Sequence, residues 1–170
     1  MKRWMCVALL LAVIMGLTAC GGGKEVKDSD QSRFTWQIEL RNSEVKASLH
    51  TDEGVQQYDG EVLNVAHDNA PSEGNVFLIL TLTINKSAVG GGGFDWTKLS
   101  VRDEKGNAYP RMADDSFLSS HTYHRLQGTK LQIGESKGSI CFEIPEGVSK
   151  GHLRLEYDAG DEGVNTIAIQ

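Results

Sequence analysis

The chain has 170 residues and a formal net charge of −6, from 17 basic and 23 acidic residues. A chain of this length suits one domain whose core is large enough to need no disulfide staple. The acidic balance argues against nucleic-acid binding and against electrostatic docking on anionic lipid. We therefore expect one folded domain with no nucleic-acid partner and no bound cofactor.

The first twenty residues have the three-part layout of a secretory signal. Lys2 and Arg3 precede an apolar run at residues 6–17, and the signal ends in Leu17-Thr18-Ala19-Cys20. The run is shorter than the ~20 apolar residues that a membrane-spanning helix needs. Its end resembles the lipobox of bacterial lipoproteins, in which the cysteine receives a diacylglyceryl group and becomes the N-terminus after cleavage. An uncleaved anchor helix with an incidental cysteine is the alternative.

The lipobox resemblance implies how the chain is divided and where it works. Residues 1–19 are expected to be a signal peptide, and residues 20–32, rich in glycine and charge, a flexible tether that begins at the lipidated Cys20. Residues 33–170 then form the folded domain. Two or more acyl chains give stable anchoring, at ~0.8 kcal/mol per buried CH₂. We expect the protein to be lipid-anchored at the cell membrane, facing the extracytoplasmic side.

The three cysteines have separate fates in this interpretation. Cys6 is removed with the signal and Cys20 is acylated, so Cys141 remains alone and an intramolecular disulfide is excluded. Alternation within residues 139–144 places Cys141 on the face opposite Ile140 and Phe142. We expect a half-buried edge residue or an exposed thiol there, with a structural role, because no base lies nearby in the sequence.

Period-two alternation is the main structural signal in the first half of the chain. Residues 33–40 alternate apolar and polar side chains, followed by a turn or bulge at residues 41–43, and residues 61–66 predict a short strand. The strongest strand is predicted at residues 76–85. One of its two rows of side chains is wholly apolar and should face the core. This row consists of Val76, Leu78, Leu80, Leu82 and Ile84. The other row begins with apolar residues and turns polar along the strand.

The second half of the chain continues the same pattern with more turns. Four glycines at residues 90–93 predict a loop, residues 103–107 a hairpin turn and residues 134–138 another turn. Residues 111–127 are the least regular segment. Further strands are predicted at residues 126–133, 140–144 and 153–157. Eight to ten short strands at ~8–12-residue spacing, without a helix pattern, indicate an antiparallel β-sandwich.

Several turn and strand motifs occur in a moderately specific order. They are Gly74-Asn75, Leu99-x-Val101-x-Asp103-x-x-Gly106-x-x-Tyr109, Leu131-x-Ile133-Gly134-Glu135-Ser136-x-x-Gly138 and Phe142-Glu143-Ile144-Pro145. Over residues 75–170 the chain resembles a bacterial domain-of-unknown-function family of lipoproteins, which shares its fold with secreted immunoprotective antigens. The resemblance implies an all-β, immunoglobulin-like (telokin-like) antiparallel β-sandwich outside the cytoplasm. It implies no catalytic residues.

Two histidines are the best metal candidates. His121 and His124 are three residues apart, so both could ligate one ion only in a turn or helix, because on a strand they would point to opposite faces. Histidine ligands suit copper or zinc. Two surface histidines in an irregular loop are the alternative. The neighbouring Asp114 and Asp115 could act as paired carboxylates, although a loop surface is the simpler interpretation.

Aromatic residues suggest a binding surface for a peptide or glycan. Phe94, Trp96, Tyr109 and Tyr123 could form one aromatic face, with packing in the core as the alternative. We expect a non-enzymatic module that binds a protein, peptide or glycan through residues 90–96, residues 111–125 or an exposed sheet edge. The alternative function is a copper- or zinc-binding envelope lipoprotein that uses His121 and His124.

Overall fold

The computed structural model describes residues 27–51, 55–58, 61–64, 67–87, 92–121, 123–126, 131 and 133–169. The predicted signal peptide, the lipobox and Cys20 lie outside these residues. Within the described part of the chain, no helix has the length and apolar character to cross a membrane.

Strands and short 3₁₀ helices make up the regular structure. The strands are β1 (Trp36–Lys46), β2 (Leu49–Thr51), β3 (Val55–Tyr58), β4 (Glu61–Asn64), β5 (His67–Asn69), β6 (Asn75–Lys86), β7 (Leu99–Arg102), β8 (Ala108–Pro110), β9 (Gly134–Pro145), β10 (Leu153–Asp158) and β11 (Val164–Ile169). The 3₁₀ helices are η1 (Gln31–Arg33), η2 (Trp96–Lys98), η3 (Ser116–His121) and η4 (Gly160–Glu162).

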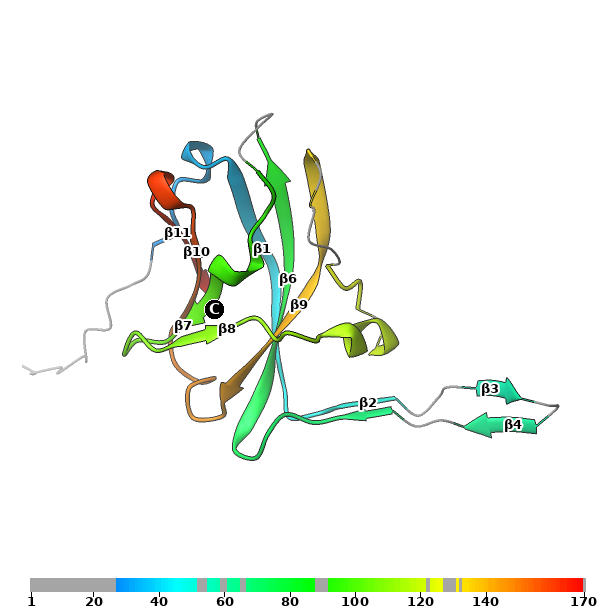
Figure 1. Cartoon of the computed structure of the whole chain (residues 1–170). Helices are drawn as coiled ribbons and strands as arrows, with labels where there is room; N and C mark the ends of the chain where they lie inside the picture. The colour runs from blue at the N-terminus through cyan, green and yellow to red at the C-terminus, as the bar shows by residue number, and fades with distance from the viewer. Residues whose placement is uncertain are drawn as a thin grey trace, which may run out of the picture.

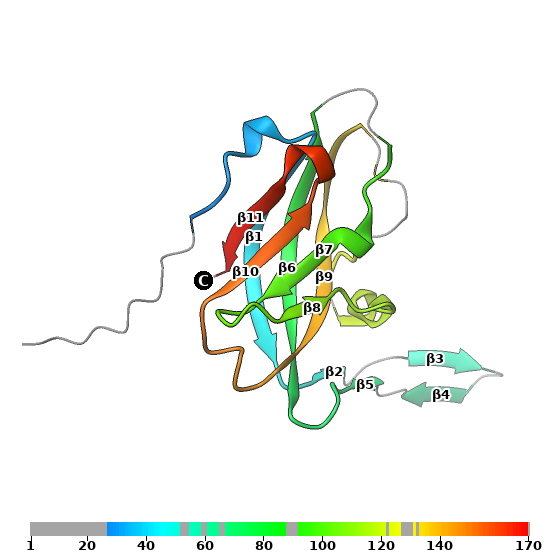
Figure 2. The ribbon, with the colours of Figure 1, turned by 60° about the vertical axis from the view of Figure 1, so that its left-hand side comes forward.

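Two antiparallel sheets pack face to face and confirm the predicted β-sandwich (Figure 1). The first sheet has the strand order β1-β6-β9 and the second the order β11-β10-β7-β8. Turning the molecule shows the second sheet lying over the first (Figure 2). One apolar core fills the space between them, with members on both sheets such as Leu80, Ile140, Val101 and Leu155.

Strand β6 is the centre of the first sheet and follows its predicted pattern. Its row from Val76 to Ile84 is buried in the main core, as expected from the uniform apolar alternation. Each such side chain contributes about 1.5–3 kcal/mol when it is fully buried. On the opposite face, Phe77 and Ile79 are also buried, while Thr81 further along is only half-buried. Thr83, the next residue on this face, is again buried at 4% exposure, so the prediction that the strand emerges from its cover along its length is wrong.

A second, smaller apolar cluster covers the outer face of the first sheet beneath η3. It consists of Leu49, Phe77, Ile79, Leu118 and Cys141. The expectation of a half-buried or exposed Cys141 is wrong, because this side chain is 0% exposed. Burial, followed by the nearby charges of Asp115 and Glu143, raises the pKa of its thiol to about 12. The alternation correctly placed Cys141 and Ile140 on opposite faces of the sheet, but the second apolar cluster covers the face that carries Cys141 as well.

The predicted turn at residues 134–138 is instead the beginning of β9. Its pairing with β6 runs without a register shift from Gly134 opposite Lys86 to Pro145 opposite Asn75. The length of β6 explains the difference, because it offers backbone partners to all of these residues. A Cβ atom on Gly138 would lie 2.5 Å from the carbonyl oxygen of His124. The glycine therefore permits a close approach between two chain segments rather than a turn.

The described residues of the segment predicted as a strand at 126–133 carry no strand. The predicted irregularity at residues 41–43 is confirmed, since the register of β1 on β6 shifts between Leu40 and Asn42. The predicted hairpin turn at residues 103–107 is also confirmed. The amide of Asp103 donates to the carbonyl oxygen of Asn107 at 3.2 Å, and β7 and β8 pair on either side.

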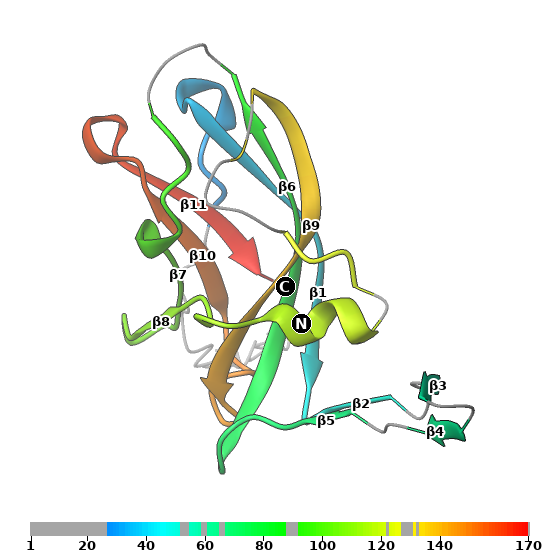
Figure 3. The ribbon, with the colours of Figure 1, turned by 45° about the vertical axis from the view of Figure 1, so that its right-hand side comes forward.

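A ribbon of two-stranded pairs projects from one end of the sandwich (Figures 1 and 3). The pair β2–β5 lies next to the sandwich, and β3–β4 lies further out. The base of this ribbon is fixed because Leu49 of β2 belongs to the second apolar cluster.

The last part of the predicted tether at residues 20–32 is attached to the sandwich, and residues 20–26 lie outside the described part of the chain. The amide of Ser29 donates to the carbonyl oxygen of Thr166 at 2.8 Å, and the amide of Ala168 donates to Asp28 Oδ1 at 2.7 Å. Residues 28–33, which we call the N-terminal strap, thus run along β11 (Figure 2). These polar residues carry no apolar pattern, and hydrogen bonds hold Asp28 and Ser29 against β11.

Candidate functional site

The four predicted aromatic residues are divided between two packing environments. Phe94 is only 3% exposed and stacks on Tyr157, with ring centroids 4.4 Å apart. Trp96 is half-buried and meets Phe94 edge-on at 4.7 Å. Tyr109 also packs against the main core, whereas Tyr123 packs against the second apolar cluster. The rings therefore do not form one continuous aromatic face.

The hydroxyl groups of the two tyrosines are bound to carboxylates. Tyr109 donates to Asp103 Oδ2 at 3.1 Å, and Tyr123 donates to Glu44 Oε2 at 3.2 Å. The pKa of each phenol is raised, mainly by desolvation and then by the neighbouring carboxylate. Both groups therefore stay protonated and act as hydrogen-bond donors within the fold.

The two candidate metal ligands occupy different environments. His121 ends η3 and is buried, with Nε2 lying 3.1 Å from the side-chain nitrogen of Asn69. His124 is exposed, and its carbonyl oxygen accepts a 2.6 Å hydrogen bond from the amide of Ser139. In the described ranges, no three side chains of His, Cys, Asp or Glu are grouped so that they could hold a metal ion.

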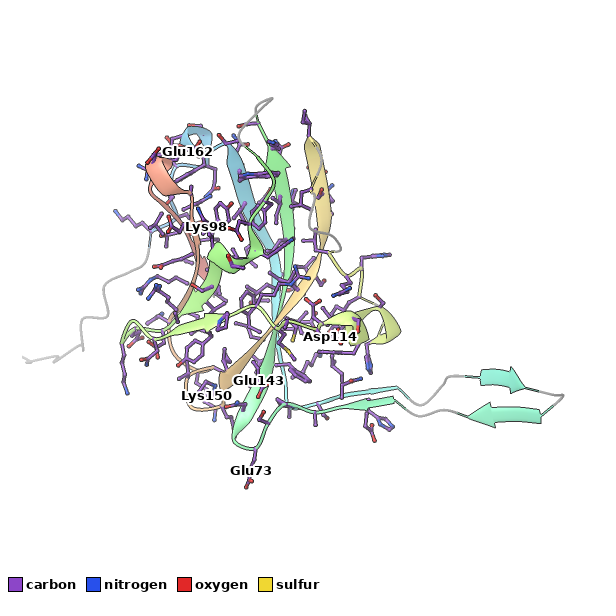
Figure 4. The ribbon with its side chains drawn as sticks, in the orientation of Figure 1. Glu73, Lys98, Asp114, Glu143, Lys150 and Glu162 are labelled. Atoms are coloured by element: carbon purple, nitrogen blue, oxygen red, sulfur yellow. The ribbon has the colours of Figure 1, made fainter. Side chains whose placement is uncertain are left out.

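Sequence reasoning missed a buried ion cluster centred on Asp115. This carboxylate is 0% exposed, and the guanidinium of Arg111 binds both of its oxygens, at 2.9 and 3.1 Å. Arg125 Nε adds a bond of 2.6 Å to Oδ1. By contrast, Asp114, labelled in Figure 4, is exposed and accepts from the amide of Ser116 at 2.9 Å. Adjacent carboxylates thus have opposite environments, and the predicted loop surface holds only for Asp114.

Arg111 joins the two segments that were predicted to bind a partner. Its guanidinium lies over the ring of Trp96, 4.2 Å from the centroid, and also donates to the carbonyl oxygen of Leu126 at 3.0 Å. Residues 92–96 and the described residues at 111–121 and 123–126 are therefore held together at Arg111. Because Asp115 is enclosed by cationic and amide donors, the cluster holds these segments together and leaves its carboxylate no access to a ligand.

A groove of about 740 Å³ runs along β1, where the first sheet ends. One of its walls is β1 itself, from Gln37 to Ser43. Other walls come from the N-terminal strap, from the outer face of β6 and β9, and from β11, through Asp28, Gln31, Thr83, Asn85, Glu135, Ile167 and Ala168. No local motif predicts this groove, because its walls come from residues that are far apart along the chain, such as Asp28 and Ala168. From the sequence alone, an exposed sheet edge was one of the expected binding surfaces, but its position was not predicted.

Side chains occupy the first part of the free edge of β1. The amide of Ile38 donates to Gln31 Oε1 at 2.9 Å, and the carbonyl oxygen of Trp36 accepts from Asn165 Nδ2 at 3.3 Å. Gln31 and Asn165 also bind each other through their amide groups, at 2.7 and 2.8 Å. At the same end, the exposed Glu162, labelled in Figure 4, accepts from the amide of Thr35 at 2.8 Å.

The groove is acidic. Its charged residues are Asp28, Glu39, Glu135 and Arg41. Arg41 is already engaged, because its NH1 atom lies 2.7 Å from Glu39 Oε1 and its Nε donates to Thr83 Oγ1 at 3.0 Å. The groove can therefore receive hydrogen-bond donors and positive charge. Its apolar lining offers little surface, because Ile38 and Ile167 are buried in the main core and Leu40 is half-buried.

No protein-family model matches the chain, and no curated protein matches it either. Two solved structures are similar to it. A conserved hypothetical protein from Bacillus anthracis is 14% identical, with a TM-score of 0.49 over 80% of this chain and 88% of that one. An uncharacterised β-sandwich protein from Clostridium difficile 630 is 13% identical, with a TM-score of 0.43 over 84% of this chain and 87% of the other.

Proposed function

We propose that this chain is a lipid-anchored, extracytoplasmic β-sandwich module that binds a protein or peptide partner in the groove along β1. It would belong to the telokin-like lipoprotein type that its sequence resembles. The observation that carries the proposal is the groove of about 740 Å³ beside an edge strand. Grooves of this size suit a bound segment, and sheet edges bind extended chains through their backbone groups.

The anchor and the groove lie close together along the chain. Residues 21–27 separate Cys20 from Asp28, which lines the groove. The eight residue steps from Cys20 to Asp28 span at most about 29 Å even when the chain is fully extended. A lipid on Cys20 would therefore hold the groove within this distance of the membrane surface, where envelope proteins are available as partners.

The lining of the groove favours a protein or peptide over a glycan. Among the described residues that line it, none is aromatic, although aromatic rings are the groups that stack on sugar faces. Backbone edges, side-chain amides and carboxylates are present instead. The copper or zinc alternative has no observation in its favour, since His121 is held beside Asn69 and His124 faces solvent.

Anchoring is tested by replacing the proposed lipidation site. Cys20→Ser should abolish incorporation of labelled palmitate and release the protein from the membrane fraction. Cys141→Ala is the matched control, because Cys141 is buried and inaccessible to acylation. This control should keep both the label and the membrane association. Palmitate incorporation into the Cys20→Ser variant would contradict the lipobox interpretation.

Partner binding is tested by photocrosslinking in cells. A photoreactive amino acid is placed at Asn42, an exposed residue of the groove, or at Lys98, an exposed residue of η2 beside Trp96 (Figure 4). A protein adduct is expected from Asn42 and not from Lys98. An adduct from Lys98 alone would move the binding surface to the predicted loop at residues 90–96. The absence of adducts from both positions would contradict the proposed function.

A further inference from the structure

The N-terminal strap occupies the backbone groups at the outer edge of β11 (Figure 2). The amide of Ala168 donates to Asp28 Oδ1 at 2.7 Å, and the amide of Thr166 donates to Ser29 Oγ at 3.0 Å. The Ser29 amide donates in turn to the carbonyl oxygen of Thr166 at 2.8 Å. In an antiparallel pair, alternate residues direct their backbone groups away from the partner strand. The strap thus takes the place that a neighbouring strand would have on β11.

Gln31 extends the strap to the first sheet. Its Oε1 accepts from the amide of Ile38 in β1 at 2.9 Å, and its side-chain amide pairs with that of Asn165 at 2.7 and 2.8 Å. Gln31 and Asp28 also line the groove along β1. The strap therefore forms one wall of the groove and covers backbone groups that belong to both sheets.

The contacts that hold the strap on the sandwich are polar. Each of residues 28–33 is exposed or half-buried, and none of them belongs to either apolar cluster. By contrast, Phe34, which follows the strap directly, is only 1% exposed. A hydrogen bond within the protein contributes little net free energy, because water replaces it when it opens. The strap can therefore detach without exposing apolar side chains of its own, and Phe34 marks the end of the segment that detaches.

Release of the strap would open the groove towards β11. It would free the amides of Ile38, Thr166 and Ala168 and the carbonyl oxygen of Thr166, which the strap engages when it is closed. Ile38 and Ala168 line the groove, so these backbone groups lie where an incoming segment would run. Such a segment would bond to the edges of both sheets at once, with its own oxygens in place of those of the strap.

We infer that the strap is an autoinhibitory segment of the groove: it holds the edges of β11 and β1 until a partner segment displaces it and takes over its hydrogen bonds. This inference rests on the proposed function and names the regulation of its site. The partner that fits is an extended protein segment that presents oxygen acceptors, because the strap leaves three amide donors and one carbonyl oxygen. Only molecules with an open strap bind this partner, so the apparent affinity is the intrinsic affinity multiplied by the open fraction.

Hydrogen exchange of the full chain in detergent measures the opening of the strap. The reporters are the amides of Ala168 and Ile38, which bind strap residues other than Ser29. Ser29→Pro removes both groups that Ser29 offers to Thr166, but it leaves the partners of the two reporters in place. Both reporters should exchange at least about threefold faster in this variant, and by the same factor, because the strap leaves as one unit. Ser29→Thr keeps the amide and the hydroxyl group and should exchange like the parent.

The amide of Ile167 is the internal reference for this measurement. By the alternation along β11, Ile167 directs its backbone groups towards β10, whereas Thr166 and Ala168 direct theirs towards the strap. Its exchange should be the same in the parent and in both variants. Acceleration confined to Thr166 would show that the strap does not leave as a unit, and equal acceleration of Ile167 would show a general loss of stability. Either result would overturn the inference.

Photocrosslinking from Asn42 connects the opening of the strap to partner binding. Asn42 lines the groove outside the strap, and Ser29 is not among the described residues that line it. At a subsaturating level of the partner, the adduct yield should rise in Ser29→Pro by the same factor as the exchange of Ala168, since both follow the open fraction. Ser29→Thr should give the parental yield. An unchanged or lower yield in Ser29→Pro would show that the partner binds with the strap in place, and would overturn the inference.

The outcomes separate this inference from the proposed function. A specific adduct from Asn42 whose yield does not respond to Ser29→Pro would refute displacement of the strap while the partner-binding function stands. The absence of an adduct from the parent and from the variant alike would refute both.

Discussion

The Asp115 cluster and the β1 groove are both polar regions beside the same three-stranded sheet, but they differ in their access to water. Asp115 is 0% exposed and is enclosed by Arg111, Arg125 and the amide of Cys141. In the groove, Glu39 and Glu135 are exposed, and their ion pairs lie at the surface. The difference shows that exclusion of water, rather than the residue types, decides whether a polar cluster is structural or available to a partner.

The energetic consequences of the two settings are unequal. Removal of one partner from a buried ion pair leaves an uncompensated charge and costs about 3–5 kcal/mol, whereas an exposed pair contributes about 0–1 kcal/mol. Substitutions in the Asp115 cluster should therefore reduce stability, and those in the groove should affect mainly binding. The following experiments test this contrast.

The largest effect is expected for Asp115→Asn, which leaves the guanidinium groups of Arg111 and Arg125 without their carboxylate. The free energy of unfolding, measured with urea, should fall by about 3–5 kcal/mol. The matched control is Asp114→Asn, which should change stability by less than about 0.5 kcal/mol, because asparagine still accepts the bond from the Ser116 amide. A loss below about 1 kcal/mol for Asp115→Asn would show that water reaches the cluster.

Gly138→Ala should have the next largest effect. The added Cβ atom would lie 2.5 Å from the carbonyl oxygen of His124 and 2.9 Å from the amide of Leu126, so the segment that carries Arg125 would have to move. We expect a loss of about 1–3 kcal/mol in the same unfolding measurement. Gly147→Ala is the control, because a Cβ there meets no atom within 4 Å. Similar stabilities for both variants would contradict the close approach at Gly138.

Gln31→Ala tests the strapped part of the β1 edge. It removes the amide that accepts from Ile38 and binds Asn165, whose side chain is buried. We expect a loss of about 1–2 kcal/mol and faster hydrogen exchange at the Ile38 amide. Gln37→Ala, whose side chain makes only a 3.5 Å contact with Asn85, should change neither quantity appreciably. Unchanged exchange at Ile38 in the Gln31 variant would mean that the strap does not protect this edge.

Glu143 is half-buried, between the enclosed Asp115 and the exposed glutamates of the groove, and its substitution should have the smallest effect on stability. Hydrogen bonds from the Asn75 side chain and then from Ser72 lower its pKa in the folded state. A lowered carboxyl pKa contributes stability that is present above the unfolded pKa and is lost as the pH falls through the folded value. Glu143→Gln should therefore flatten the fall in stability below about pH 4.5. An unchanged acid limb would contradict the assigned hydrogen bonds.

Local alternation in the sequence predicted much of the sandwich correctly. The apolar row of β6, the bulge at Arg41 and the hairpin turn that begins at Asp103 were all recognisable from neighbouring residues. These features depend on period-two patterns and turn chemistry, which operate over a few residues. The lipobox at Cys20 is a local signal of the same kind, and its role stays a prediction.

The tertiary structure alone decided which polar residues are enclosed and which line a groove. Nothing local distinguishes Asp115 from Asp114, or shows that Gly134 to Gly138 pair with β6 instead of turning. These outcomes depend on segments far apart in the chain, such as the strap beside β11 and η3 above Cys141. The positions of most strands and the sandwich class follow from local patterns in the sequence, whereas the exclusion of water follows only from the assembled sheets, because it requires cover from distant parts of the chain.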